Sequence, residues 1–269
     1  MMGNVFVTVE KVETPARFID TRFNLTDALE GRKLYDKEHI AGAVYFDLEK
    51  DLSDMAKKEG RHPMPEKQQL HDLFETAGLS LGDRIYIYDQ GGTPFAPRAW
   101  WMLTYAGFTN VKIVNGGFEA LKQAGYATTS NKESFDRTQL IPNWQENIYA
   151  NRDFVKAVVD GEKSSVLLDA RAAIRYRGEH EPIDPVAGHI PTAKNYDWEQ
   201  VKDGNHLVVA DNLEAVISKD QEVVVYCGSG VTASPLYTVL KEAGYENVKL
   251  YVGSFSDWIT EHEAATGEE

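Results

Sequence analysis

The stretch VVVYCGSGVTASPLY, residues 223–237, predicts a strand, a loop and a helix in direct succession. The apolar run Val223–Tyr226 is typical of a fully buried strand. A helix is expected to follow, with Ser234 as its N-cap and Pro235 as its first residue. Cys227–Thr232 then form a tight loop between the two. Strands that lead into helices through short connections indicate an α/β fold with a mainly parallel sheet.

The loop begins with the chain's single cysteine, at the carboxyl end of a strand, where open α/β sheets place their functional residues. Gly228 and Gly230 allow the backbone to approach a bound group closely. Consecutive N–H groups and the start of the helix can together bind an anion, which favours the thiolate of Cys227. We therefore expect a reactive sulfur nucleophile. The alternative is a small apolar core residue, as free cysteines often are.

Four motifs occur twice along the chain in the same order, which predicts a duplicated domain. They are FIDTR (18–22) and LLDAR (167–171), HIAGAVYFDL (39–48) and HIPTAKNYDW (189–198), RIYIYDQGG (84–92) and EVVVYCGSG (222–230), and AGFTNVKIVNGGF (106–118) and AGYENVKLYVGSF (243–255). We place the first domain at residues 1–126, a polar linker at 127–147 and the second domain at 148–269.

In the first copy, Asp89 stands at the position that Cys227 has in the second. The fold therefore does not require sulfur there, which argues against a purely structural cysteine. Other chemically capable residues recur in both copies, and for these a scaffold role is the better interpretation. They are Asp20, Arg22 and His39 in the first copy and Asp169, Arg171 and His189 in the second.

The composition argues against several classes of function. A formal net charge of -14 disfavours non-specific binding to nucleic acid or to an anionic membrane. One cysteine permits neither an internal disulfide nor a paired-cysteine site, and no motif requires a metal or an organic cofactor. No apolar run is long enough to span a membrane and the N-terminus lacks a secretory signal, so we expect a cytoplasmic protein. Cysteine phosphatases need an arginine where this chain has Ala233, which argues against phosphate-ester hydrolysis.

The motifs together resemble the tandem-domain rhodaneses, a family of sulfurtransferases. The resemblance rests on the duplication and on FIDTR, HIAGAVYFDL, RHPMP, APRAWWML, NGGF and above all CGSGVTA. A loop of this form is similar to that of the 3-mercaptopyruvate branch, whereas the thiosulfate branch typically carries basic residues after the cysteine. The resemblance implies two rhodanese-like domains, each a mainly parallel sheet flanked by helices. It also implies that the second domain is catalytic and the first inactive, and Asp89 in place of the cysteine fits that division.

The same resemblance implies a covalent mechanism. The Cys227 thiolate takes a sulfur atom from 3-mercaptopyruvate, or from thiosulfate, and becomes a persulfide. A thiol, cyanide or a thioredoxin-like protein then accepts that sulfur. The loop residues Gly228, Gly230, Val231 and Thr232 are expected to hold the donor and the charged persulfide.

Further site residues follow from matching the family pattern. Ser229, His62 and an acid resemble a relay, and the acid falls nearest Glu49, with Asp51 close by. Arg175 is at the position of the family's substrate-binding arginine, whose guanidinium suits a carboxylate.

The mercaptopyruvate branch has a second arginine slightly later in the chain, where EHEPIDPVAGHI (179–190) contains none. Arg61 and Arg177 are the two candidates to replace it. Two further hypotheses of function remain, besides a 3-mercaptopyruvate sulfurtransferase and a thiosulfate sulfurtransferase. One is a protein persulfide carrier and the other a non-catalytic binding module, against which the intact CGSGVTA loop argues.

Overall fold

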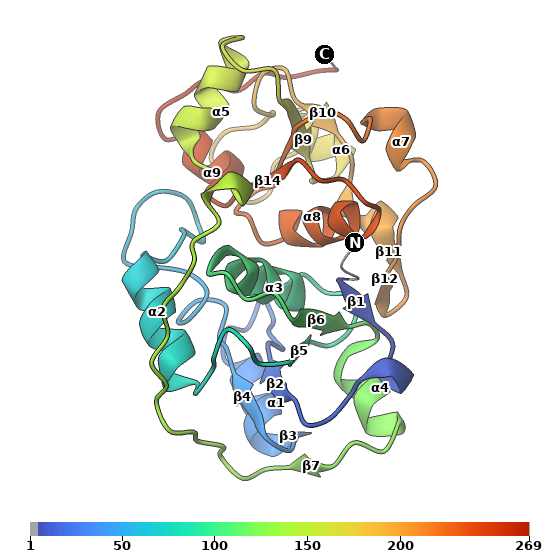
Figure 1. Ribbon diagram of the computed structural model, residues 1–269. Helices are drawn as coiled ribbons and strands as arrows, with labels where there is room; N and C mark the ends of the chain where they lie inside the picture. The colour runs from blue at the N-terminus through green and yellow to red at the C-terminus, as the bar shows by residue number, and fades with distance from the viewer. Residues whose placement is uncertain (1–4, 269) are drawn as a thin grey trace. The chain divides into compact units, whose positions relative to one another are not determined.

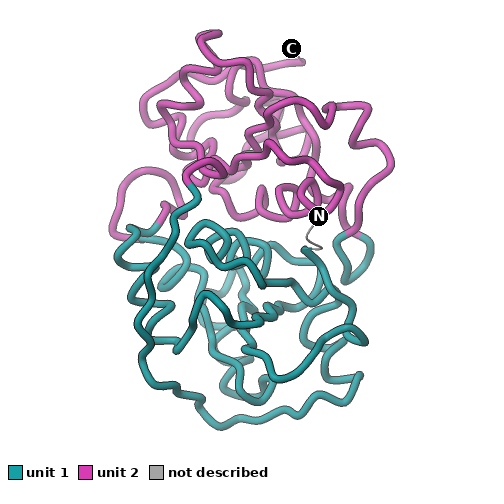
Figure 2. Tube along the Cα trace, viewed as in Figure 1, with its two compact units in different colours: residues 1–54, 65–145, 203–207 teal, residues 55–64, 146–202, 208–269 magenta. Residues whose placement is uncertain are grey.

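The computed structural model describes residues 5–268, and their contacts group the chain into two compact units (Figure 2). Unit 1 comprises Met1–Asp54, Pro65–Gln145 and Asp203–Leu207, and unit 2 comprises Met55–Met64, Glu146–Lys202 and Val208–Glu269. The short segment Met55–Met64 thus belongs to unit 2 although unit 1 residues flank it on both sides in the sequence.

Unit 1 is built on a parallel sheet with the strand order β1-β6-β5-β2-β4, and β3 pairs separately with β7 in antiparallel fashion. Its elements are β1 (Phe6–Val7), η1 (Val9–Lys11), β2 (Arg17–Asp20), α1 (Glu30–Lys37), β3 (His39–Ile40), β4 (Ala43–Tyr45), α2 (Lys67–Thr76), β5 (Ile85–Tyr88), α3 (Phe95–Tyr105), β6 (Val111–Val114), α4 (Gly117–Gln123) and β7 (Thr128–Thr129).

Helices cover both faces of this sheet, and Figure 1 shows α3 and α4 on opposite sides of it. Tyr86 and Tyr88 of β5 pack with Phe118 and Leu121 of α4, while Trp101 of α3 is fully buried. A strand with two covered faces needs apolar side chains in both directions, which explains the uninterrupted run IYIY in β5.

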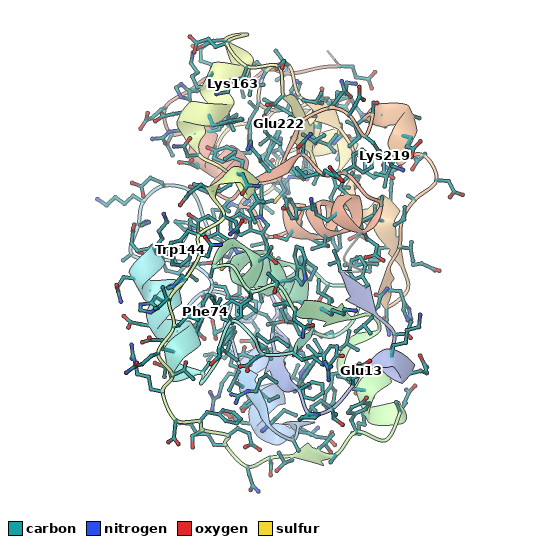
Figure 3. The ribbon with its side chains drawn as sticks, in the orientation of Figure 1. Glu13, Phe74, Trp144, Lys163, Lys219 and Glu222 are labelled. Atoms are coloured by element: carbon teal, nitrogen blue, oxygen red, sulfur yellow. The ribbon has the colours of Figure 1, made fainter. Side chains whose placement is uncertain are left out.

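Helix α2 shows how local sequence fixes an element of this unit. It begins with a capping box in which the Glu66 N–H donates to the Gln69 side chain over 2.6 Å. Near its end, Phe74 (labelled in Figure 3) is fully buried, with its ring centroid 6.2 Å from that of Phe46 and 5.5 Å from that of Phe108.

Unit 2 is built on a parallel sheet with the strand order β10-β9-β13-β14-β8. Its elements are η2 (Glu146–Ile148), β8 (Tyr149–Ala150), α5 (Arg152–Val159), β9 (Val166–Asp169), α6 (Ala173–Tyr176), β10 (Lys194–Asn195), η3 (Trp198–Val201), α7 (Leu213–Val216), β13 (Val223–Tyr226), α8 (Ala233–Glu242), β14 (Val248–Tyr251) and α9 (Ser254–Trp258). Between η3 and α7 in the sequence, β11 (Lys202–Asp203) pairs with β12 (His206–Leu207), and Asp203–Leu207 of this hairpin group with unit 1. Val224 and Tyr226 of β13 pack with Val155, Phe255 and Trp258 in the core.

The two sheets have the same topology, because β1, β6, β5, β2 and β4 correspond in order to β8, β14, β13, β9 and β10. Their register also agrees: Asp20 lies opposite Tyr88 in unit 1, and Asp169 lies opposite Tyr226 in unit 2. The predicted α/β fold with mainly parallel sheets is confirmed.

Buried ion pairs recur at the same place in both units. Asp20 binds Arg22 over 2.6 Å, and Asp169 binds Arg171 over 2.7 Å. Each arginine also donates to a backbone carbonyl over 2.6 Å. A pair that is present with and without the cysteine supports the scaffold interpretation of these four residues.

The two recurring histidines are held alike. Nδ1 of His39 is 2.7 Å from the carbonyl of Tyr35, and Nδ1 of His189 is 2.8 Å from that of Tyr176. Each imidazole also stacks on the ring of the same tyrosine. These contacts support a scaffold role for both histidines.

The helix after the cysteine loop begins earlier than the sequence predicts. Helix α8 starts at Ala233, so Thr232 is the N-cap and the prediction of Ser234 in that position is wrong. The Ser234 hydroxyl instead donates to the carbonyl of Gly230 over 2.9 Å, one turn back. Pro235 is tolerated because the first amides of a helix have no partner within it.

Within residues 5–268, no helix has both the length and the apolar character needed to cross a membrane.

Candidate active site

The start of α9 holds the cysteine loop in place. The carbonyls of Cys227 and Gly228 accept hydrogen bonds from the N–H groups of Phe255 (3.0 Å) and Ser256 (2.9 Å). In the other direction, the N–H of Cys227 donates to Oγ of Ser254 over 3.1 Å. The first two peptide groups of the loop are therefore fixed by backbone and side-chain contacts.

The two glycines of the loop are required for different reasons. Gly230 has a φ of 73°, and a Cβ there would lie 2.2 Å from the carbonyl oxygen of Val252. Gly228 does not need a left-handed backbone, but a Cβ there would lie 2.3 Å from Nη2 of Arg61 and 3.5 Å from Nη2 of Arg175. The absence of a side chain at Gly228 lets a guanidinium group approach the loop beside the cysteine.

Beyond Cys227, the backbone N–H groups of the loop are left without acceptors among the described residues. In the described part of the chain, the N–H groups from Gly228 to Thr232 donate to no acceptor. The corresponding loop of unit 1 shows what such amides bind, because the Asp89 carboxylate accepts from Gly91 (2.8 Å) and Ala96 (3.0 Å). Burial raises the pKa of Asp89 in spite of these bonds. In unit 1 the carboxylate of Asp89 occupies the loop and accepts from its amides. In unit 2 the same position holds the thiol of Cys227, and the N–H groups that follow it in the loop have no acceptor among the described residues.

Two of the predicted relay residues lie together. Nδ1 of His62 is 2.9 Å from Oγ of Ser229, and both side chains are buried. His62 comes from the segment Met55–Met64, which belongs to unit 2 with the cysteine loop. Cys227 itself is only 1% exposed, so a donor has to pass the residues around the loop before it can contact the sulfur.

The acidic candidates belong to unit 1. The N–H of Glu49 donates to Asp47 over 3.0 Å, but among residues 5–268 the Glu49 carboxylate has no hydrogen-bond or ion-pair partner. The Asp51 carboxylate accepts from the Asp47 N–H over 2.8 Å, and burial raises its pKa. The acid of the relay stays a prediction.

Two arginines meet at the loop through one carboxylate. Asp184 accepts from Nε (2.8 Å) and Nη2 (3.2 Å) of Arg61 and from Nη2 of Arg175 (3.2 Å). Of the two candidates for the second arginine, Arg61 therefore lies beside Arg175. Arg177 pairs with Glu179 over 2.6 Å instead.

Glu181 anchors Arg175 from the other side. It accepts from Nε (3.0 Å) and Nη2 (2.8 Å) of Arg175, a bidentate geometry, and from Arg171 over 3.3 Å. Burial raises the pKa of Glu181, but the bonds from Arg175 and from the backbone N–H groups of Asp184 and Ile183 outweigh it and hold that pKa below its ordinary value.

Val231 and Thr232 complete the loop. Val231 is buried, and Thr232, half-buried, makes no side-chain capping bond at the start of α8. Among residues 5–268, the backbone N–H groups of both residues and the Thr232 hydroxyl have no hydrogen-bond partner.

A family model described as "Rhodanese-like domain" matches residues 9–124 and again 152–261. The chain belongs to the rhodanese-like family.

Relatives of this rhodanese-like protein carry two kinds of name. A Pseudomonas aeruginosa protein named for 3-mercaptopyruvate sulfurtransferase activity is 38% identical over 262 residues, covering 93% of this chain and 92% of the relative. A Mycobacterium tuberculosis protein named for thiosulfate sulfurtransferase activity is 33% identical over 273 residues, covering 96% and 95%. The crystal structure of a 3-mercaptopyruvate sulfotransferase from Escherichia coli has a TM-score of 0.79 at 28% identity, covering 94% of this chain and 99% of that one. The predicted family and the predicted enzyme class, a sulfurtransferase, are confirmed.

Three residues of the rhodanese-like site were not singled out from the sequence. Asp184 and Glu181 lie in EHEPIDPVAGHI, and nothing local in that segment indicates that their carboxylates bind Arg61 and Arg175. Ser254 has a φ of 58° and corresponds to Gly117 of unit 1, whose φ is 69°. A serine in place of a glycine at a left-handed position is the signal that could have identified it.

Proposed function

We propose that this sulfurtransferase uses 3-mercaptopyruvate as its donor and carries the transferred sulfur as a persulfide on Cys227. The observation that carries the proposal is the combination at one loop of a lone cysteine, unused backbone N–H groups and two guanidinium groups. The amides suit a charged sulfur, and the guanidinium groups suit the donor carboxylate.

In the first half-reaction, the Cys227 thiolate attacks the thiol sulfur of the donor. The bond between that sulfur and the methylene carbon breaks, and its electron pair stays with the carbon as the enolate of pyruvate. One proton then converts the enolate into pyruvate. Pyruvate dissociates, and Cys227 remains as a persulfide.

Ser229 and His62 are suited to deliver that proton. Their side chains are within hydrogen-bonding distance of one another, at 2.9 Å, and Ser229 is separated from Cys227 by one residue. The hydroxyl can donate to the leaving enolate while the imidazole returns a proton to the hydroxyl oxygen. The acid of the relay, Glu49 or Asp51, stays a prediction from the family pattern.

In the second half-reaction, an acceptor takes the outer sulfur and the Cys227 thiolate is released. A thiol, cyanide or a thioredoxin-like protein satisfies this chemistry, and ping-pong kinetics are expected because the first product leaves before the acceptor reacts.

Thiosulfate is the second candidate donor. Two arginines near the loop favour it, because a dianion gains more than a monoanion from two cations. In that reaction the thiolate takes the outer sulfur of thiosulfate and sulfite leaves with the electron pair of the broken S–S bond. The persulfide-carrier role, the domain boundaries, the inactivity of the first domain and the cytoplasmic location stay predictions.

The test is the mass of the protein after exposure to each donor, followed by peptide mapping. We expect the peptide that contains Cys227 to gain one sulfur atom, and the variant Cys227→Ser to gain none and to release no pyruvate. Retained turnover in Cys227→Ser would refute the persulfide. A wild-type gain of sulfur from thiosulfate alone would reassign the donor.

A further inference from the structure

The two guanidinium groups beside the cysteine already share a resident carboxylate. Asp184 is the sole acceptor that the described residues offer to the Arg61 guanidinium, and it also binds Arg175. Its own side chain is 1% exposed. A donor carboxylate seeking the same N–H groups therefore meets a protein carboxylate that is already bound to them.

The cluster around Asp184 is electrically balanced. Three arginines and three carboxylates are joined by ion pairs within unit 2; they are Arg61, Arg171 and Arg175 with Asp169, Glu181 and Asp184. An anionic donor consequently meets a group of arginines and carboxylates whose charges cancel. Removing the charge of Asp184 alone would leave an excess of one cation.

The two arginines of the site differ in how firmly they are held. Arg175 has a second, bidentate partner in Glu181, and its side chain is 17% exposed. The Arg61 guanidinium has no partner besides Asp184 in residues 5–268, and its side chain is 33% exposed. Arg61 is thus the group that can exchange Asp184 for a donor without disturbing the rest of the cluster.

From these contacts we infer that Asp184 is a specificity-determining residue. It competes with anionic donors for Arg61 and Arg175, and it weakens the binding of dianions more than the binding of monoanions. The inference rests on the proposed use of these arginines for the donor. Asp184 acts through the arginines and not on the reacting sulfur, so it sets KM and leaves kcat close to its wild-type value.

The dependence on donor charge follows from Coulomb's law. Repulsion between Asp184 and a bound anion is proportional to the charge of that anion. Because Asp184 is buried, bulk water gives the lower limit: at a separation of about 4 Å, each unit of charge then corresponds to about a fivefold change in affinity. We expect Asp184→Asn to tighten the binding of a monoanion at least about fivefold and that of a dianion at least about twenty-five-fold.

The experiment measures binding first, with unreactive probes, so that it does not depend on turnover. Pyruvate serves as the monoanion and sulfate as the dianion, and their dissociation constants are measured by calorimetry for the wild type and Asp184→Asn. The matched control is Glu179→Gln, which removes one negative charge from the same segment at a side chain that is 54% exposed and bound to Arg177. This control should bind both probes as the wild type does.

A second variant separates charge from structure. Asp184→Glu keeps the charge but changes the shape, whereas Asp184→Asn keeps the shape and removes the charge. Competition predicts that only the asparagine variant tightens binding, and a merely structural role predicts that the glutamate variant is the more disturbed. Steady-state kinetics should then show KM for thiosulfate falling more than KM for 3-mercaptopyruvate, with kcat little changed.

Equal or weaker binding of both probes in Asp184→Asn would overturn the inference, because Asp184 would then support the arginines and not compete for them. An equal gain for both probes would overturn the dependence on charge. Failure of the proposed function would give a different result. Cys227 of the wild type would then gain no sulfur from either donor, while the wild type and Asp184→Asn would still differ in their affinity for pyruvate and sulfate.

Discussion

Substitution of Gly228 by alanine isolates the part that Arg61 plays in donor binding. The new Cβ would lie 2.3 Å from Nη2 of Arg61, whereas its next neighbours, on Arg175 and Asp184, lie at an ordinary 3.5 Å. Because the tip of Arg61 is flexible and Gly228 does not require a left-handed backbone, the guanidinium will move away and the fold will remain. The substitution therefore displaces one cation and leaves the cysteine in place.

The magnitude follows from the contacts that are lost. A hydrogen bond to a charged group contributes about 1.5–3 kcal/mol, and the partial exposure of Arg61 argues for the lower end. A loss of about 1.5 kcal/mol raises KM for either donor about tenfold. Stability should fall by about 1 kcal/mol or less, because Asp184 loses its bonds from the partly exposed Arg61 but keeps its bond from Arg175.

The assay is steady-state kinetics with each donor, together with thermal unfolding. Gly82→Ala is the matched control, since a Cβ at Gly82 meets nothing within 4 Å, and it should leave KM unchanged. Arg61→Ala and the double variant Gly228→Ala/Arg61→Ala complete a cycle, in which the second substitution should add nothing to the first. An unchanged KM in Gly228→Ala, or full additivity in the cycle, would refute the reasoning.

Three further predictions concern other contacts of the two units. Ser254→Gly removes the acceptor of the Cys227 N–H but also relieves the backbone strain of a serine with positive φ. We therefore expect thermal stability to change little and kcat to fall. An unchanged kcat would show that this hydrogen bond does not position the loop. Asp89→Ala leaves the N–H groups of Gly91 and Ala96 without their acceptor, which should cost about 1–3 kcal/mol of unfolding free energy with persulfide formation at Cys227 intact, as denaturant titration and mass measurement can verify. Glu181 has a folded-state pKa below its ordinary value of 4.5, so its charged form stabilises the native state above about pH 4.5, and that contribution is lost as pH falls through the folded-state pKa. Glu181→Gln should therefore lose less stability on acidification than the wild type. Parallel curves of unfolding free energy against pH for the two proteins would contradict this sign.

The sequence was sufficient for the architecture because its patterns are local. Uninterrupted apolar runs such as Val223–Tyr226 and glycines after helices, such as Gly107 (φ 100°) and Gly244 (φ 89°), act over a few residues. The repeated motifs then gave two copies of the same topology. The one local error, the start of α8, arose because Ser234 satisfies a backbone carbonyl and not the helix amides.

The parts of the site that escaped prediction are those made by residues distant in sequence. Arg61 lies more than 100 residues before Asp184, and nothing local indicates that the segment Met55–Met64 groups with unit 2. The sequence offered both Arg61 and Arg177 as replacements for the missing arginine, because no local pattern shows which of them lies near the cysteine loop. Only the ion pairs that each one forms distinguish between them.

The two loops that follow β5 and β13 also give each molecule an internal reference for hydrogen exchange. The Gly91 amide is bonded to a carboxylate of its own loop, whereas its counterpart at Ser229 has no acceptor within residues 5–268. In deuterated water the first should exchange slowly and the second quickly. Loading the cysteine with sulfur should slow the second alone, so the ratio of the two rates would report the fraction of charged enzyme without any assay of product.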